Sequence, residues 1–138
     1  MNRDDLKTLS GLRVEEAKCL FQNGFHCGAY YLVGYAVECA FKAAIARQVR
    51  QHDFPEKKLV NDSYTHDLKK LLDVSGLKTR LDEAIRGNAA LELNWSVVKD
   101  WSEETRYRHD IPGATAKDLL DACTSTPDGV LSWLSNWW

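Results

Sequence analysis

The feature that most constrains the fold is a long apolar stretch without proline, over about residues 25–50. Its central part, CGAYYLVGYAVECAFKAAIA, is apolar on nearly every side of a helix, so that helix needs neighbours all around it. A membrane would also surround it, but Glu38 and Lys42 fall inside the stretch and three tyrosines lie near its middle. We therefore expect a long helix in the centre of a helical bundle, and no membrane.

Turn residues divide the rest of the chain into shorter helices. Apolar residues recur there at helical spacing, and no stretch alternates apolar and polar residues for long enough to predict a strand. The fold class is therefore all-α. A polar segment containing Pro55, over residues 52–65, is expected to be a surface connection. Besides the long helix, we expect helices from Asp4 or Asp5 to Gly24, from a cap at Ser63 or Thr65 to Gly76, over Leu77–Ile85, over Leu91–Trp101, and from Ala114 or Thr115 through Ala122.

Composition sets limits on function. A chain of 138 residues suits one domain, residues 1–138, and its 44% hydrophobic and 28% charged residues are ordinary for a globular protein. The net charge of −2 argues against a dedicated duplex-binding protein, so any nucleic-acid contact must be local. The N-terminus carries charges where a signal peptide needs an apolar stretch, which favours a cytoplasmic location.

The cysteines and the known sequence motifs indicate no cofactor and no metal. Cys19, Cys27, Cys39 and Cys123 lack zinc-binding spacing, and free, buried thiols are the expected state. A glycine-rich phosphate loop, an HExxH motif, a nucleophile elbow and an acidic cluster at metal spacing are also missing from the sequence.

Glu38 is the most unusual residue of the long helix. A buried, isolated carboxylate costs several kcal/mol, so Glu38 needs a partner. Lys42 lies one turn further along, and together the two form a structural polar anchor. We expect a stronger partner from another helix, first Arg106 and second His66. Glu38 then serves either as a buried tether or as part of a functional site.

Arg106, Tyr107, Arg108 and His109 form a compact cationic cluster with one aromatic member. Such a cluster can hold a phosphate and stack a base, although a solvated loop gives the same pattern. His66 is either a ligand-binding residue or a capping histidine. For the five tryptophans, packing onto the body or a dimer contact is favoured over a ligand cage.

The sequence resembles the HEPN domains of prokaryotes. The resemblance rests on GAYYLVGYAVECAFKA, residues 28–43, followed in order by His66-Asp67-Leu68 and Arg106-Tyr107, and it extends from about Leu12 to Leu120. It implies an up-and-down bundle of four or five helices, commonly a homodimer, in nucleic-acid metabolism and defence. Some members are metal-independent ribonucleases, some partner a minimal nucleotidyltransferase, and some bind RNA or nucleotides without cutting.

The ribonuclease members have an arginine followed after four to six residues by a histidine. Here only two residues separate Arg106 from His109, a spacing that a helix would still keep on one side. Arg47 and His52 have the required spacing, but one such match is expected by chance in this composition.

Three hypotheses follow from these residues. The first is an HEPN-like module that binds RNA or nucleotide as a homodimer in a defence or toxin–antitoxin type system, with weak or absent cleavage. In it, Tyr107, Arg108, His109 and His66 face the ligand. The second is a metal-independent endoribonuclease in which Arg106 and His109 are catalytic. The third is a dimerising scaffold whose Trp-rich C-terminus docks a partner, so that truncation after Asp128 would leave the bundle folded.

Overall fold

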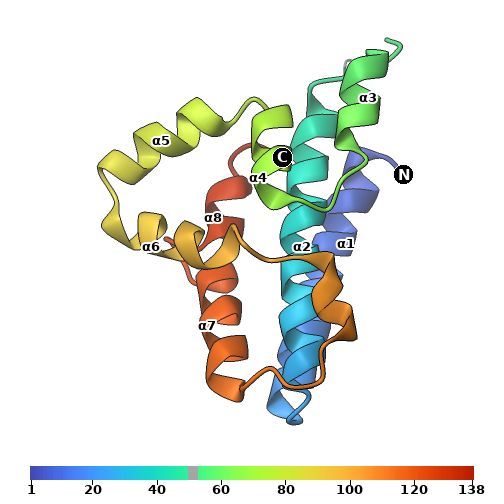
Figure 1. Ribbon diagram of the computed structural model, residues 1–138. Coiled ribbons are helices and arrows are strands. Elements are labelled where there is room, and N and C mark those ends of the chain that lie inside the picture. The colour runs from blue at the N-terminus through green and yellow to red at the C-terminus, as the bar shows by residue number, and fades with distance from the viewer. Residues whose placement is uncertain (50–52) are drawn as a thin grey trace.

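The structure is a computed structural model that describes residues 1–49 and 53–138. Within these two ranges there is no β-strand, which confirms the all-α prediction. Figure 1 shows upright helices side by side, with a group of short helices to one side. In chain order, the elements are α1 (Arg3–Gln22), α2 (His26–Arg47), α3 (Lys57–Ser63), α4 (Leu68–Val74), α5 (Lys78–Arg86), α6 (Ala89–Val98), the 3-10 helix η1 (Glu103–Tyr107), α7 (Gly113–Thr124) and α8 (Val130–Leu134).

Helix α2 is the central helix that the apolar stretch predicts. It runs antiparallel to α1 along most of its length, and α7 packs on another side (Figure 1). Contacts from α4, η1 and α8 cover further parts of it. Most of its second half is buried as a result, including Glu38. The described helix ends at Arg47. Residue 50, where the predicted stretch ends, and His52 of the nominal Arg47–His52 match lie outside the described residues.

The described residues form eight α-helices rather than four or five, because several helices are only one or two turns long. Gly76 adopts a φ of +73° after α4, a left-handed conformation that favours glycine and ends the helix. Helix α3 lies inside the segment expected to be a connection. Lys58 pairs with Asp62 one turn later within α3, which supports a short helix that periodicity alone did not indicate.

The helix caps differ in detail from those expected. Asn2, not Asp4 or Asp5, caps α1: its side chain accepts a hydrogen bond from the Asp5 amide, and the Asp5 carboxylate accepts one from the Asn2 amide. Gly24, with a φ of +83°, follows the end of α1 as predicted. Helix α4 begins with Asp67 as its cap instead of Ser63 or Thr65.

Tryptophans contribute to the core, as the packing interpretation expected. Trp101 is buried against Gly34 of α2 so closely that a Cβ atom on residue 34 would overlap the indole Nε1. Trp133 of α8 is also buried and lies 6.3 Å from Trp137, between ring centres. Glycine at residue 34 is therefore required by the packing of Trp101, in the connection between α6 and η1, on α2.

The thiols only partly match the expectation of burial. Cys39 and Cys123 are buried, whereas Cys27 is half-buried and Cys19 is exposed; all four are free. Burial raises the pKa of Cys39 to about 11 and also raises that of Cys123.

None of the helices in residues 1–49 and 53–138 combines the length and the apolar character that crossing a membrane requires.

Candidate ligand-binding site

One side of α2 carries four side chains that we call the α2 stripe: Tyr31, Tyr35, Glu38 and Lys42. Their spacing of four, three and four residues places them on the same side of the helix. Tyr31, Tyr35 and Lys42 are half-buried, while the residues on either side of Tyr35 and of Lys42 are buried. Three of the four side chains of the stripe are therefore partly accessible to a ligand.

The Glu38 carboxylate lies in the middle of this stripe and is fully satisfied. Its side chain is 2% exposed, and it accepts a hydrogen bond from the Lys42 Nζ at 2.9 Å. Both carboxylate oxygens lie 3.0 Å from the Nδ1 of His66. The contact with His66 was expected as the second choice, and the contact with Lys42 forms the polar anchor.

The expectation that Arg106 is the first partner of Glu38 is wrong. Arg106 lies in η1, which packs on α2 near Tyr31, and seven residues of helix separate Tyr31 from Glu38 by about 10 Å. The start of α4 instead brings His66 over the carboxylate. The fold thus places His66 next to Glu38 and Arg106 next to Tyr31 and Tyr107.

The position of His66 depends on the cap of α4. The Asp67 side chain accepts hydrogen bonds from the backbone amides of Lys69 and Lys70, at 3.0 and 3.2 Å, and so fixes the residue after His66. The His66 side chain remains 49% exposed. A carboxylate at Nδ1 orients the ring and leaves Nε2 to interact with a ligand, as in carboxylate–histidine pairs elsewhere.

Arg106 and Tyr107 continue the α2 stripe at its other end. The Arg106 guanidinium lies over the Tyr107 ring, 4.9 Å from its centre, and Tyr107 is 74% exposed. Interaction with the Tyr107 side chain, and less strongly with Tyr31, raises the pKa of Arg106. Tyr31 in turn stacks on Tyr35 at 6.3 Å and on Trp101 at 6.0 Å between ring centres. A row of aromatic rings therefore connects Arg106 with the Glu38 anchor.

Arg108 and His109 lie beyond η1 and are arranged differently. Arg108 has an extended backbone (φ −81°, ψ 142°), so no continuous helix joins Arg106 to His109, and the two residues do not share one side of a helix. The Arg108 Nε lies 2.7 Å from the Asp110 carboxylate, which lowers the pKa of Asp110 and raises that of Arg108. His109 is exposed.

A groove of about 520 Å³ adjoins the Glu38 end of the stripe. Tyr35, Glu38 and Lys42 line one wall, and the opposite wall comes from the start of α1, from α3 with Leu59, and from Tyr64 directly after α3. Its volume lies within the range of small-molecule sites, roughly 300–1,000 Å³. A nucleobase or a nucleoside could therefore enter beside the anchor.

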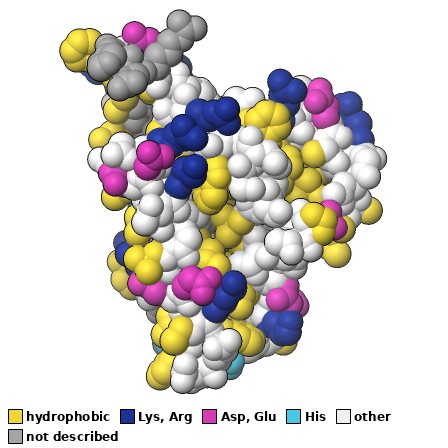
Figure 2. All heavy atoms as spheres, turned by 180° about the vertical axis from the view of Figure 1, so that it is seen from behind, with side chains coloured by type: hydrophobic (Ala, Val, Ile, Leu, Met, Phe, Trp, Pro, Cys, Tyr) yellow, Lys and Arg dark blue, Asp and Glu magenta, His cyan; other side chains and the backbone are white. Residues whose placement is uncertain are grey.

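Only a few charged side chains belong to the site, among them Glu38, Lys42 and Arg106. The face seen from behind in Figure 2 carries both acidic and basic side chains. Among the described residues, no group of three or more His, Cys, Asp or Glu side chains is placed to hold a metal ion. The arrangement can therefore bind by stacking and by a few local charges.

Tyr31 and Tyr35 are the members of the site that the sequence interpretation did not select. Their spacing to Glu38 and Lys42 was visible in the sequence and is the signal that could have identified them.

Comparisons of the chain with models of protein families, with curated proteins and with solved structures gave no match.

Proposed function

We propose that this protein is an HEPN-like helical module that binds single-stranded RNA or a nucleotide along the α2 stripe and η1, with weak or absent cleavage. The resemblance in residues 28–43 supports the family assignment. It also supports action as a homodimer, alone or with a nucleotidyltransferase-like partner, in a defence or toxin–antitoxin type system.

One observation carries the proposal. Three segments that are distant in the sequence, at Tyr31–Lys42, His66 and Arg106–Tyr107, come together as one row of aromatic and polar side chains. Stacking on aromatic rings beside a few cationic groups is how proteins hold unpaired bases and their phosphates.

The charges favour a single strand over a duplex. Lys42 and His66 are engaged by Glu38, and Arg108 is engaged by Asp110, so within the α2 stripe and η1 Arg106 is the main cation available to a phosphate. Few phosphate contacts mean a modest affinity with a shallow dependence on salt. Stacking of the bases would therefore contribute more to the free energy of binding than the charge of the phosphates would.

No specific observation favours the other two functions. A ribonuclease mechanism needs the histidine and the arginine at one phosphate, but the chain turns between Arg106 and His109. The scaffold hypothesis places docking at the Trp-rich C-terminus, where Trp133 is buried in the core and Trp137 and Trp138 are half-buried.

Fluorescence anisotropy with labelled RNA oligonucleotides tests the proposal. Tyr107→Ala is expected to weaken binding by about 1–3 kcal/mol, the usual contribution of one stacked base. Arg86→Ala, which removes an exposed arginine from α5 away from the stripe, is the matched control and should leave the affinity unchanged.

Arg106→Ala should both weaken RNA binding and flatten its dependence on salt. Equal affinities for wild type, Tyr107→Ala and Arg106→Ala would contradict the proposal. Cleavage of the oligonucleotide, abolished by His109→Ala, would instead establish the endoribonuclease.

A further inference from the structure

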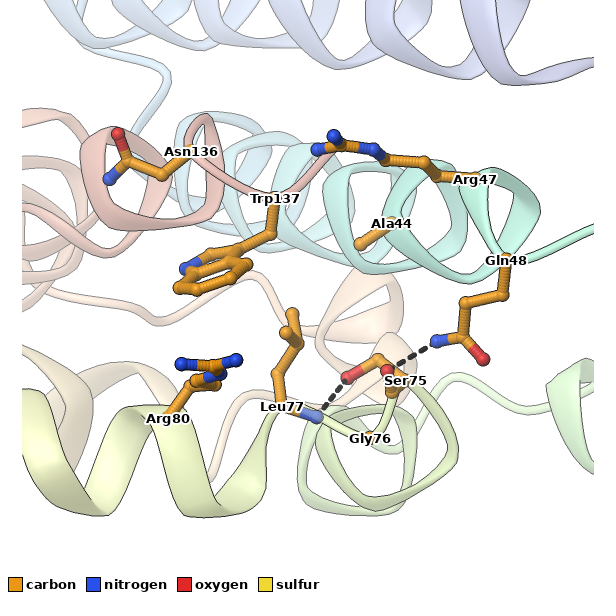
Figure 3. Close-up of a pocket in the computed structure, with 9 residues that line it drawn as sticks. All are labelled: Ala44, Arg47, Gln48, Ser75, Gly76, Leu77, Arg80, Asn136 and Trp137. Carbon is orange, nitrogen blue, oxygen red and sulfur yellow. Dashed lines mark hydrogen bonds between the residues drawn. The ribbon is translucent and has the colours of Figure 1, made fainter.

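A second pocket, of about 430 Å³, lies at the C-terminal end of α2 (Figure 3). Its walls are the end of α2, the turn between α4 and α5, and the segment after α8. Ala44 lines it from a side of α2 that is about 200° around the helix from Lys42. The pocket is therefore separate from the α2 stripe.

Two arginines define the charge of this pocket. Arg47 reaches over it from the last turn of α2, and Arg80 faces it from the first turns of α5 (Figure 3). No acidic side chain lines the pocket, and neither arginine forms an ion pair within the described ranges. The other polar groups that line the pocket include the side-chain amides of Gln48 and Asn136. The pocket is thus positively charged and has no anion of its own.

The Arg80 guanidinium is held in place before any ligand arrives. It stacks on the Trp137 ring, 5.2 Å from the ring centre. Stacking uses the flat face of the guanidinium and leaves the N–H groups on its edge for an anion. Figure 3 shows the Arg80 guanidinium on one side of the indole ring and the Arg47 guanidinium on the other, along α2.

The two walls that carry the arginines are joined directly. The Gln48 side chain donates a hydrogen bond to the Ser75 carbonyl, which ties the end of α2 to the turn before α5. The Ser75 hydroxyl accepts a hydrogen bond from the Leu77 amide at 3.3 Å, which shapes the same turn. These bonds hold the turn before α5, and with it Arg80, close to the end of α2 that carries Arg47. Such preorganisation reduces the entropic cost of binding.

We propose that this pocket binds the phosphate group of a small phosphate monoester. Two guanidinium groups match the charge of a phosphate monoester, which is between −1 and −2 near neutral pH, better than that of a single carboxylate. The volume exceeds that of a phosphate alone, and Ala44 and Leu77 offer apolar surface to the esterified part of the ligand. This site does not depend on RNA binding at the α2 stripe.

Isothermal titration calorimetry with AMP, inorganic phosphate and adenosine tests the assignment. AMP and inorganic phosphate are expected to bind, AMP more tightly, and adenosine is expected not to bind. Arg80→Gln and Arg47→Gln should each weaken AMP binding by about tenfold to a hundredfold, the usual effect of losing a charge-assisted hydrogen-bond pair. Arg86→Gln removes the same charge from the far end of α5 and should change nothing.

Other outcomes would overturn the proposal. Absence of saturable AMP binding, binding of adenosine as tight as that of AMP, or full AMP affinity in both arginine variants would each exclude a phosphate site here. Because both arginines are exposed, the variants should fold, which circular dichroism checks. If Tyr107→Ala abolishes AMP binding and Arg80→Gln does not, the nucleotide occupies the α2 stripe, and this pocket is excluded while the proposed function stands.

Discussion

Gly34 and Trp101 show how closely individual residues are fitted around α2. At residue 34 the indole of Trp101 occupies the space that a side chain would take. Trp101 also stacks on Tyr31, the first residue of the α2 stripe. The packing at Gly34 therefore supports the binding residues as well as the core.

Gly34→Ala is expected to lower the free energy of unfolding by about 3 kcal/mol, because the added methyl group must displace the buried indole. Gly11→Ala is the matched control: it lies in α1, where the added methyl group would have no atom within 4 Å, and it should stabilise the protein by up to about 1 kcal/mol. Urea denaturation measures both. Equal effects of the two substitutions would contradict this packing.

The four thiols should react in an order set by exposure and by pKa. Burial raises the pKa of Cys39 to about 11, and it raises that of Cys123 as well, so at pH 8 both remain in the unreactive thiol form. Iodoacetamide is expected to modify the exposed Cys19 first and to reach Cys39 and Cys123 only after unfolding. Mass spectrometry of the peptides follows the order, and early labelling of Cys123 would refute it.

At the scale of elements, short helices place the site. Helix α4 has only seven residues, yet it delivers His66 to Glu38, and η1 delivers Arg106 and Tyr107 to the tyrosines of α2. Helices this short are not stable alone and depend on their caps and on packing. Their caps therefore influence function.

Asp67→Ala removes the cap of α4 and is expected to cost about 1 kcal/mol of stability. Because His66 directly precedes this cap, RNA affinity should fall together with stability. Asp73→Ala, on the exposed side of the same helix, should change stability by less than about 0.5 kcal/mol and leave binding intact. Thermal unfolding and anisotropy report the two effects, and a stable Asp67→Ala variant with full affinity would argue against the role of this cap.

Local signals in the sequence predicted the elements better than the contacts between them. The apolar stretch located α2, and Gly24 and Gly76 marked helix ends, because these features depend on the chain's own conformation. The partner of Glu38 depends instead on how α4 and η1 pack along α2. Sequence spacing contains no information on whether residue 66 or residue 106 lies opposite residue 38. Arg80 and Trp137 were also not paired by the sequence interpretation, because they are distant in the chain and meet only through tertiary packing.

At the scale of the whole molecule, the C-terminal helix completes the core. Val130, Trp133 and Leu134 of α8 are buried, and α8 packs against α2, α6 and α7. Helix α8 is therefore part of the bundle.

Truncation after Asp128 is expected to abolish cooperative folding. Loss of three buried side chains removes about 6 kcal/mol of stabilisation that comes from apolar burial. This is comparable with the roughly 5–15 kcal/mol by which a typical domain is stable. Near-UV circular dichroism during heating should then show no cooperative transition. A truncated chain that melts sharply near the wild-type temperature would show that α8 is dispensable, as the scaffold hypothesis requires.

The coverage of α2 also has a consequence for the order of folding. Its first neighbour, α1, is adjacent in the chain, so this antiparallel pair forms by local contacts and can form early. Its second neighbour, α7, begins at Gly113, about 65 residues after α2 ends. During synthesis, one apolar side of α2 therefore stays uncovered until α7 has been made. The nascent chain is most prone to aggregation in that interval.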